Sequence, residues 1–236
     1  MMMPVSVAPK ILAVDTSTRR GSVALLEGRD LRAELRLDSP RTHSTLLLNS
    51  IRFLLGRLDW TLKDLNLVAV GMGPGSFTGI RIGIATALGI AQSLSLPIAG
   101  VSGLEALAHQ AQQPNGPIGV VLDAHRSQVF YAEYVRHKGR IRQSQKSVVL
   151  DVTDLERQLG NRHLYVVGDM EACRIRQAAA GPTAWPRLIP ADLFLAAGIG
   201  RIACARKNRW RSGDFMLSEP VYVRPPDALR NRRGKR

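Results

Sequence analysis

Cysteine is scarce in this sequence. The 236 residues include only Cys173 and Cys204, which are too few for a disulfide framework and lack the companion ligands that a zinc site needs. We therefore expect two buried thiols in a reducing compartment, with the cytoplasm as the default location. The stretch 1–9 is short and only mildly apolar before Lys10, which does not predict a signal peptide.

Charged residues are absent from 82–104, a stretch long enough to cross a bilayer. Its glycines, alanines and scattered polar residues make it only weakly apolar. The pattern indicates a buried helix followed by a buried strand, so we expect no contact with a membrane.

Catalytic and metal-binding motifs are missing as well. The histidines, at positions 43, 109, 125, 137 and 163, include no two that lie three to five residues apart, so the sequence holds no HxxxH or HExxH metal pair. It has no GxSxG nucleophile motif either. We therefore expect no catalytic residue and no metal ligand.

A glycine-rich segment, GMGPGSFTG at 71–79, separates the apolar run 67–70 from a helical pattern. Its glycines permit a sharp turn, and the amides at the start of a helix suit an anion. One interpretation is a phosphate site at Gly73, Gly75 and Ser76. The other is a tight turn that packs the helix closely on its sheet.

Two familiar phosphate motifs are incomplete in this segment. A P-loop needs Lys-Ser or Lys-Thr after its last glycine, whereas Ile80 and Arg81 follow Gly79. The dinucleotide fingerprint needs a third glycine where Ser76 stands, and an acidic residue that is absent between Arg81 and Glu105. A nicotinamide cofactor is therefore not expected.

Basic residues outnumber acidic ones, 33 against 19, and the excess is concentrated near the end of the sequence. Residues 201–236 carry +8 of the formal net charge of +14. Such a tail is typical of a protein with a polyanionic partner, although a frayed, solvated end would look the same. The candidate contacts are Arg230, Arg232, Arg233, Lys235 and Arg236.

The two halves of the sequence predict the same order of elements, β-β-β-α-β-α. In the first half we expect strands at 10–15, 22–27, 31–37 and 67–70, and helices at 42–56 and 79–95. In the second half we expect strands at 118–123, 129–135, 141–149 and 164–167, and helices at 151–159 and 170–180. The lobes would comprise residues 1–112 and 117–224, followed by a mobile tail at 225–236. A later helix at 191–207 could pack back on the first lobe, a connection at 182–190 should be irregular, and a last strand is expected at 220–224.

An acidic residue ends the first strand of each half, Asp15 in one and Asp123 in the other. Duplicated α/β lobes with such acids are typical of the actin, sugar-kinase and Hsp70 superfamily (ASKHA). Asp15 and Thr16 are therefore candidates for contacting a nucleotide phosphate or its Mg²⁺. Alternatively, Asp15 caps the turn 16–18 through backbone amides.

The sequence resembles the bacterial TsaB (YeaZ) family over nearly its whole length. The matching segments are ILAVDTST at 11–18, RTH at 41–43, GMGPGSFTGIRIG at 71–83, PIAGVSGLEALA at 97–108, LDAHRSQVFYAEY at 122–134 and EPVYVR at 219–224. The resemblance implies a non-catalytic subunit of the complex that makes N6-threonylcarbamoyladenosine at position 37 of tRNA. In that complex a TsaD-type transferase carries the HxxxH site, and a TsaE-type ATPase joins it.

The resemblance also implies a partner surface on the helices 42–56 and 79–95. The first of these helices is apolar on more than one side, because Leu48 and Phe53 lie off its main apolar face. The predicted contact residues are His43, Leu46, Leu47, Ser50, Ile51, Leu54, Gly79, Arg81 and Gly83. ATP or ADP with Mg²⁺ could bind at the partner interface near Arg81, tRNA would be bound through the complex, and a homodimer is expected when the partner is absent.

Two other functions fit the same residues. The chain could be an independent ATP-binding phosphotransferase or hydrolase of the same superfamily that uses Asp15. It could also be a self-associating scaffold that uses the same apolar helices.

Overall fold

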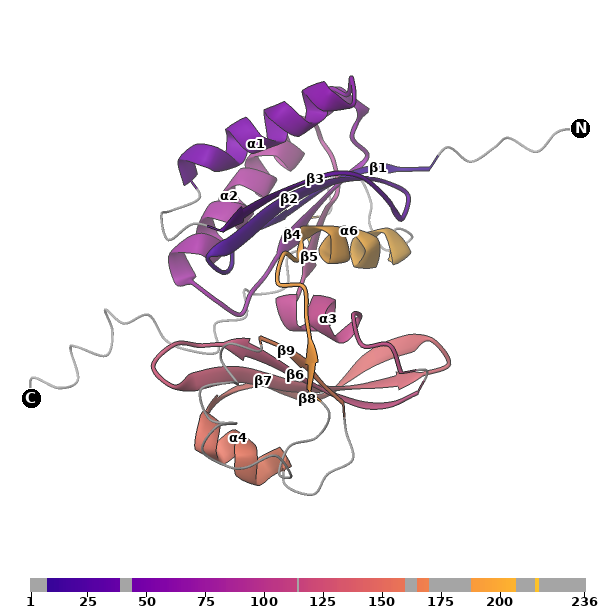
Figure 1. Ribbon diagram of the computed structural model, residues 1–236. Coiled ribbons are helices and arrows are strands. Elements are labelled where there is room, and N and C mark those ends of the chain that lie inside the picture. The colour runs from indigo at the N-terminus through magenta and orange to yellow at the C-terminus, as the bar shows by residue number, and fades with distance from the viewer. Residues whose placement is uncertain are drawn as a thin grey trace, which may run out of the picture. The chain divides into compact units, whose positions relative to one another are not determined.

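The computed structural model describes residues 8–38, 44–113, 115–159, 165–169, 188–206 and 215–216. The chain divides into two compact units (Figure 1). The first comprises Met1–Met72, Thr78–Val101 and Phe194–Pro220, and the second Gly73–Phe77, Ser102–Leu193 and Val221–Arg236.

The first unit is built on a six-stranded sheet with the order β11-β5-β4-β1-β2-β3. Its strands are β1 (Lys10–Asp15), β2 (Arg20–Glu27), β3 (Asp30–Asp38), β4 (Leu67–Gly71), β5 (Ile98–Val101) and β11 (Phe215–Met216). The first three strands pair antiparallel, whereas β4 and β5 run parallel to β1. Strands β1 and β4 are apolar almost throughout because helices cover both faces of the sheet.

Helices α1 (Ser44–Arg57) and α2 (Phe77–Ser93) cover one face of this sheet, and α6 (Ala196–Ala205) covers the other (Figure 1). The face under α1 and α2 carries Leu12 and Val14, which share a core cluster with Leu47 of α1. The opposite face carries Ala13, and a Cβ on Gly200 of α6 would lie 3.2 Å from the Ala13 side chain. A short 3₁₀ helix, η1 (Leu62–Asp64), precedes β4.

The second unit is built on a five-stranded sheet with the order β10-β9-β6-β7-β8. Its strands are β6 (Gly116–Asp123), β7 (Gln128–His137), β8 (Arg140–Asp151), β9 (Tyr165–Gly168) and β10 (Leu188–Pro190). Helices α3 (Gly103–Ala108) and α4 (Val152–Leu159) lie on opposite faces of it (Figure 1). Tyr131, Leu155 and Val166 belong to the core cluster on the α4 side.

The two sheets have the same topology. The order β5-β4-β1-β2-β3 in the first unit is repeated as β10-β9-β6-β7-β8 in the second, and a helix follows the third strand of each, α1 after β3 and α4 after β8. The predicted fold class, α/β with a duplicated topology, is therefore confirmed.

Several predicted boundaries need correction. The helix expected at 79–95 is α2 at Phe77–Ser93, and the helix expected at 191–207 is described only as α6 at Ala196–Ala205. Asp151, expected to begin a helix, instead ends β8, and the connection expected to be irregular contains β10. The expected helix at 170–180, strand at 220–224 and basic tail lie outside the described residues.

The uncharged stretch 82–104 contains most of α2 and then β5, as predicted. Within the part of the chain that the structure describes, no helix is long and apolar enough to cross a bilayer.

Candidate functional site

The turn between β1 and β2 is the most enclosed polar feature of the first unit. Asp15, Thr16 and Ser17 are all buried. The Asp15 carboxylate accepts a hydrogen bond from the backbone N–H of Ser17 over 3.3 Å. Asp15 thus caps its own turn, as one of the two interpretations of the sequence proposed.

The same turn is joined to the start of α2. The hydroxyl of Thr16 donates a hydrogen bond to the carbonyl oxygen of Gly79 over 2.7 Å, and both groups are buried. This bond links the end of β1 to the first turn of the helix that follows the glycine-rich segment.

Two glycines leave room for this turn. A Cβ on Gly71 would collide with the Asp15 carboxylate, and a Cβ on Gly83 would come within 2.5 Å of the Thr16 hydroxyl. The predicted role of Gly79 and Gly83 as a partner contact remains a prediction. Both are buried, and within their own unit the Gly79 carbonyl bonds to Thr16 while Gly83 lies against the Thr16 hydroxyl.

We expect Thr16→Val to lower the free energy of unfolding by about 1 kcal/mol, because the buried hydrogen bond from Thr16 to the Gly79 carbonyl is lost. Thr78→Val makes the same change at an exposed position of α2 and should have an effect below about 0.5 kcal/mol. Urea unfolding of the two variants measures this difference. Equal effects would show that the Thr16 hydrogen bond contributes nothing specific.

The glycine-rich turn 72–76 is held by backbone hydrogen bonds. The N–H of Met72 donates to the carbonyl of Val101 over 2.9 Å, and the carbonyl of Gly73 accepts from the N–H of Gly103 over 2.8 Å. Gly73 has a φ of 82°, a conformation that favours glycine. These contacts fix the start of α3, while the predicted phosphate contacts of Gly73, Gly75 and Ser76 remain a prediction.

The turn between β6 and β7 is the counterpart of the β1–β2 turn in the second unit. The Asp123 carboxylate accepts a hydrogen bond from the N–H of His125 over 2.8 Å, so it caps its turn as Asp15 does. His125, Arg126 and Ser127 have φ values of 60°, 57° and 60°. Three consecutive non-glycine residues in the left-handed region are rare, and such backbone conformations cluster at functional sites.

An ion pair joins the β1–β2 turn to the end of β3. The guanidinium of Arg19 donates two hydrogen bonds to the Asp38 carboxylate, over 2.7 and 3.2 Å. This hydrogen bonding lowers the pKa of Asp38 below its ordinary value. The Asp38 carboxylate therefore takes up its proton at a lower pH than a free aspartate does.

Helix α1 exposes three large apolar side chains. Leu46 is 44% exposed, Leu48 54% and Phe53 51%. The guanidinium of Arg57 lies 5.0 Å from the centre of the Phe53 ring. Leu46 and Phe53, seven residues apart, lie on one flank of α1, and Leu48 lies on the opposite flank, with the buried face between the two flanks. We call Leu46, Leu48 and Phe53 together the α1 outer row.

The α1 outer row differs from the predicted partner surface. Leu47, Ser50, Ile51 and Leu54 are buried within the first unit, so the structure leaves them no exposed side chain to offer a partner. Leu46 is the only apolar residue of the predicted set on the outer side of α1. Leu48 and Phe53 are apolar residues off the main apolar face in the sequence, but the predicted contact residues did not include them. Arg81 is exposed on α2, and His43 lies outside the described residues.

Metal-binding side chains do not gather in the described part of the chain. Within it, no group of three or more His, Cys, Asp or Glu residues is arranged to hold a metal ion. Cys204 is a buried free thiol, and Cys173 lies outside the described residues.

Two sheets that share the order of five strands, each with an acid that caps the turn after its first strand, define a duplicated α/β protein of the actin-like class. Solved structures of the same fold include YeaZ from Pseudomonas aeruginosa, with a TM-score of 0.70 and 26% identity over 91% of this chain and 99% of that one. Another is a P. aeruginosa protein described as similar to peptidase YEAZ, with a TM-score of 0.70 and 28% identity over 92% of this chain and all of that one.

The family follows from the sequence comparisons. Residues 38–178 match the family model described as TsaD, tRNA N6-adenosine threonylcarbamoyltransferase. The tRNA threonylcarbamoyladenosine biosynthesis protein TsaB of Escherichia coli is 41% identical over 134 residues, and that of Bacillus subtilis 38% over 133. Each match covers 56% of this chain and 58% of the relative. The chain belongs to the family that this model describes, and it is similar to the TsaB proteins over a little more than half of their length.

Proposed function

We propose that this chain is the non-catalytic subunit of the system that makes N6-threonylcarbamoyladenosine at position 37 of tRNA, and that it binds and supports a TsaD-type transferase. The names of the curated relatives support the place in tRNA threonylcarbamoyladenosine biosynthesis. The α1 outer row is the observation that carries the binding role. Three large apolar side chains exposed on one helix favour a protein partner.

The residues of the chain support an accessory role. No two histidines in the sequence have the HxxxH spacing that the family resemblance attributes to the transferase. Asp15, the acid that an independent phosphotransferase would use, is buried and takes part in capping its own turn.

The other proposed properties follow from the same resemblance. A TsaE-type ATPase would join the complex, ATP or ADP with Mg²⁺ would bind at the partner interface near Arg81, and the chain would act in the cytoplasm. Without its partner, the α1 outer row would support a homodimer, since one apolar surface can serve both associations.

The test is to mix the purified chain with the TsaD-type transferase of the same organism and separate the mixture by size. We expect the two to elute together at the mass of a complex. Depletion of the chain in cells should also lower the threonylcarbamoyladenosine content of tRNA, and re-expression should restore it.

Separate elution, or ATP turnover by the isolated chain that Asp15→Asn abolishes, would contradict the proposal and favour an independent enzyme. A homodimer that persists with the transferase present would favour a scaffold.

A further inference from the structure

The end of the β7–β8 hairpin carries a concentration of positive charge that the proposed partner surface does not use. Residues 134–150 contain five Lys or Arg and no Asp or Glu. Residues 1–200 have a net charge of +6, so this segment supplies +5 of it. The positive charge of residues 134–150 can be seen in the sequence, but the tail is more basic, and the predicted RNA contacts were placed only there.

The hairpin presents its cations in a fixed arrangement. Its two-residue turn consists of Lys138 and Gly139, with φ values of 48° and 75°, which is the backbone of a tight hairpin turn. The N–H of Lys138 donates to the Asn115 side chain over 2.9 Å, and the guanidinium of Arg136 donates to the carbonyl of His109 over 3.4 Å. These bonds anchor the end of the hairpin within the second unit.

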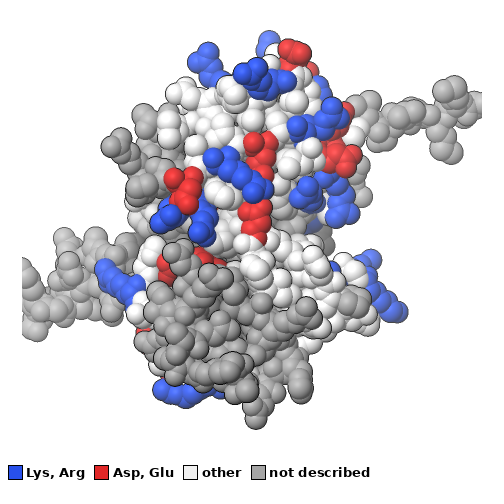
Figure 2. Space-filling view, viewed as in Figure 1, with Lys and Arg blue, Asp and Glu red and all other residues white. Residues whose placement is uncertain are grey.

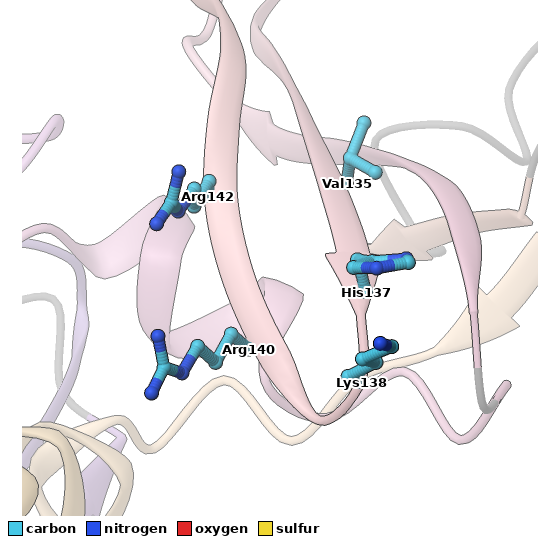
Figure 3. Close-up of a pocket in the computed structure, with 5 residues that line it drawn as sticks. All are labelled: Val135, His137, Lys138, Arg140 and Arg142. Atoms are coloured by element: carbon cyan, nitrogen blue, oxygen red, sulfur yellow. The ribbon is translucent and has the colours of Figure 1, made fainter.

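The strand register places four side chains on one face. Val135 pairs with Arg142 and His137 pairs with Arg140, so these four lie on the same face of the hairpin, with Lys138 at the turn. The five residues line an open hollow of about 450 Å³. In Figure 3 the guanidinium groups of Arg140 and Arg142 extend on the same side of β8. We call Lys138, Arg140 and Arg142 the hairpin cations.

The β2–β3 hairpin of the first unit is the equivalent of the β7–β8 hairpin, and its charges are arranged differently. Two of its cations face carboxylates, since Arg32 pairs with Glu27 and Arg36 with Glu34, each over 2.7 Å. None of the ion pairs among the described residues includes a hairpin cation. Figure 2 shows blue beside red over the first unit, and blue without red beside it at the end of the β7–β8 hairpin.

We propose that the hairpin cations bind the phosphate backbone of RNA. Arg140 and Arg142 lie two residues apart on one strand, roughly 6–7 Å, so their planar heads can each take a separate phosphate. A membrane surface fits less well, because residues 135–150 include no aromatic side chain and Val135, 39% exposed, is the large exposed apolar residue at this end. The choice of RNA rests on the proposed role in tRNA modification.

The test compares three triple variants of the full chain in tRNA binding across a series of salt concentrations. The hairpin variant is Lys138→Gln, Arg140→Gln and Arg142→Gln. The matched control, Arg29→Gln, Arg32→Gln and Arg36→Gln, removes the same charge from the equivalent hairpin. The third, Arg230→Gln, Arg232→Gln and Arg233→Gln, removes it from the tail.

We expect the hairpin variant to bind tRNA at least about tenfold more weakly at low salt, with a slope of log affinity against log salt shallower by about 2. In the matched control, the affinity for tRNA and the salt slope should both stay close to those of the wild type. An effect of the tail variant alone, an equal effect of the matched control, or binding of the wild-type chain to phosphatidylserine vesicles but not to tRNA would overturn the proposal.

Co-elution with the transferase tests the proposed function independently of the RNA site. The hairpin variant should still elute with the TsaD-type transferase. Loss of tRNA binding in that variant would support the RNA site even for a wild-type chain that fails to bind the transferase. Unchanged tRNA binding in a variant that forms the complex would overturn the RNA site and leave the proposed function intact.

Discussion

Replacing Leu48 and Phe53 together by aspartate is expected to abolish co-elution with the TsaD-type transferase while leaving the chain folded. Both side chains are more than half exposed, so a charge at either position is solvated in the free chain. In a complex that covers the α1 outer row, the same charges would be desolvated without a partner. At about 2 kcal/mol for each residue, the dissociation constant should rise by about a thousandfold.

A control variant, Leu31→Asp, makes the same chemical change at another exposed apolar position of the first unit. It should bind the transferase like the wild type. A second comparison, Ile51→Asp, buries a charge in the core beneath α1 and should unfold the first unit, so loss of binding there would carry no information about the interface. Normal binding by the Leu48 and Phe53 double variant would show that the partner docks elsewhere.

Replacing Gly168 by alanine is expected to lower the free energy of unfolding by about 3 kcal/mol or more. A Cβ at this position would collide with the carbonyl oxygen of Val121 and lie 2.8 Å from its carbonyl carbon. That carbonyl already accepts a hydrogen bond from the N–H of Asp169 over 3.0 Å. The atoms in the way belong to the backbone of β6, which is paired with β9 in the same sheet, so they cannot turn aside as a side chain could.

The matched control is Gly89→Ala in α2, where a Cβ would meet nothing within 4 Å. It should stabilise the chain by about 1 kcal/mol, because alanine is the better helix former. Urea unfolding gives both values, and hydrogen exchange should place the loss for Gly168→Ala at the amides of β6 and β9. A change of less than about 1 kcal/mol would mean that β9 can shift away from β6 at little cost.

The topology was predictable from the sequence because it depends on patterns that many residues share. Apolar runs that end in Asp15 and Asp123, with polar turns after them, mark the first strand of each half. The repeated order of elements then predicts two similar sheets, and the sheet orders bear this out. Short edge strands such as β10 were missed because three residues carry too little periodicity to distinguish a strand from a loop.

The candidate site was predictable only in part. Periodicity in the sequence identifies the apolar face of a helix, but it does not say whether that face packs on the chain's own sheet or on a partner. Leu47 and Ile51 lie on the main apolar face of α1, and that face packs on the sheet. The apolar residues of α1 left for a partner are the exposed ones, Leu46, Leu48 and Phe53. Gly83 was equally ambiguous, since a small residue can admit a second helix or, as here, a neighbouring threonine.

The order in which the chain is synthesised constrains how the first unit can form. Strands β1 to β5 are complete by Val101, yet the helix that covers one face of their sheet, α6, begins at Ala196. Until the ribosome has released that helix, the face bearing Ala13 and Leu26 has no cover. The first unit therefore completes its core only after most of the second has emerged, and a fragment that ends between the two halves would expose a bare apolar sheet, a surface prone to aggregation.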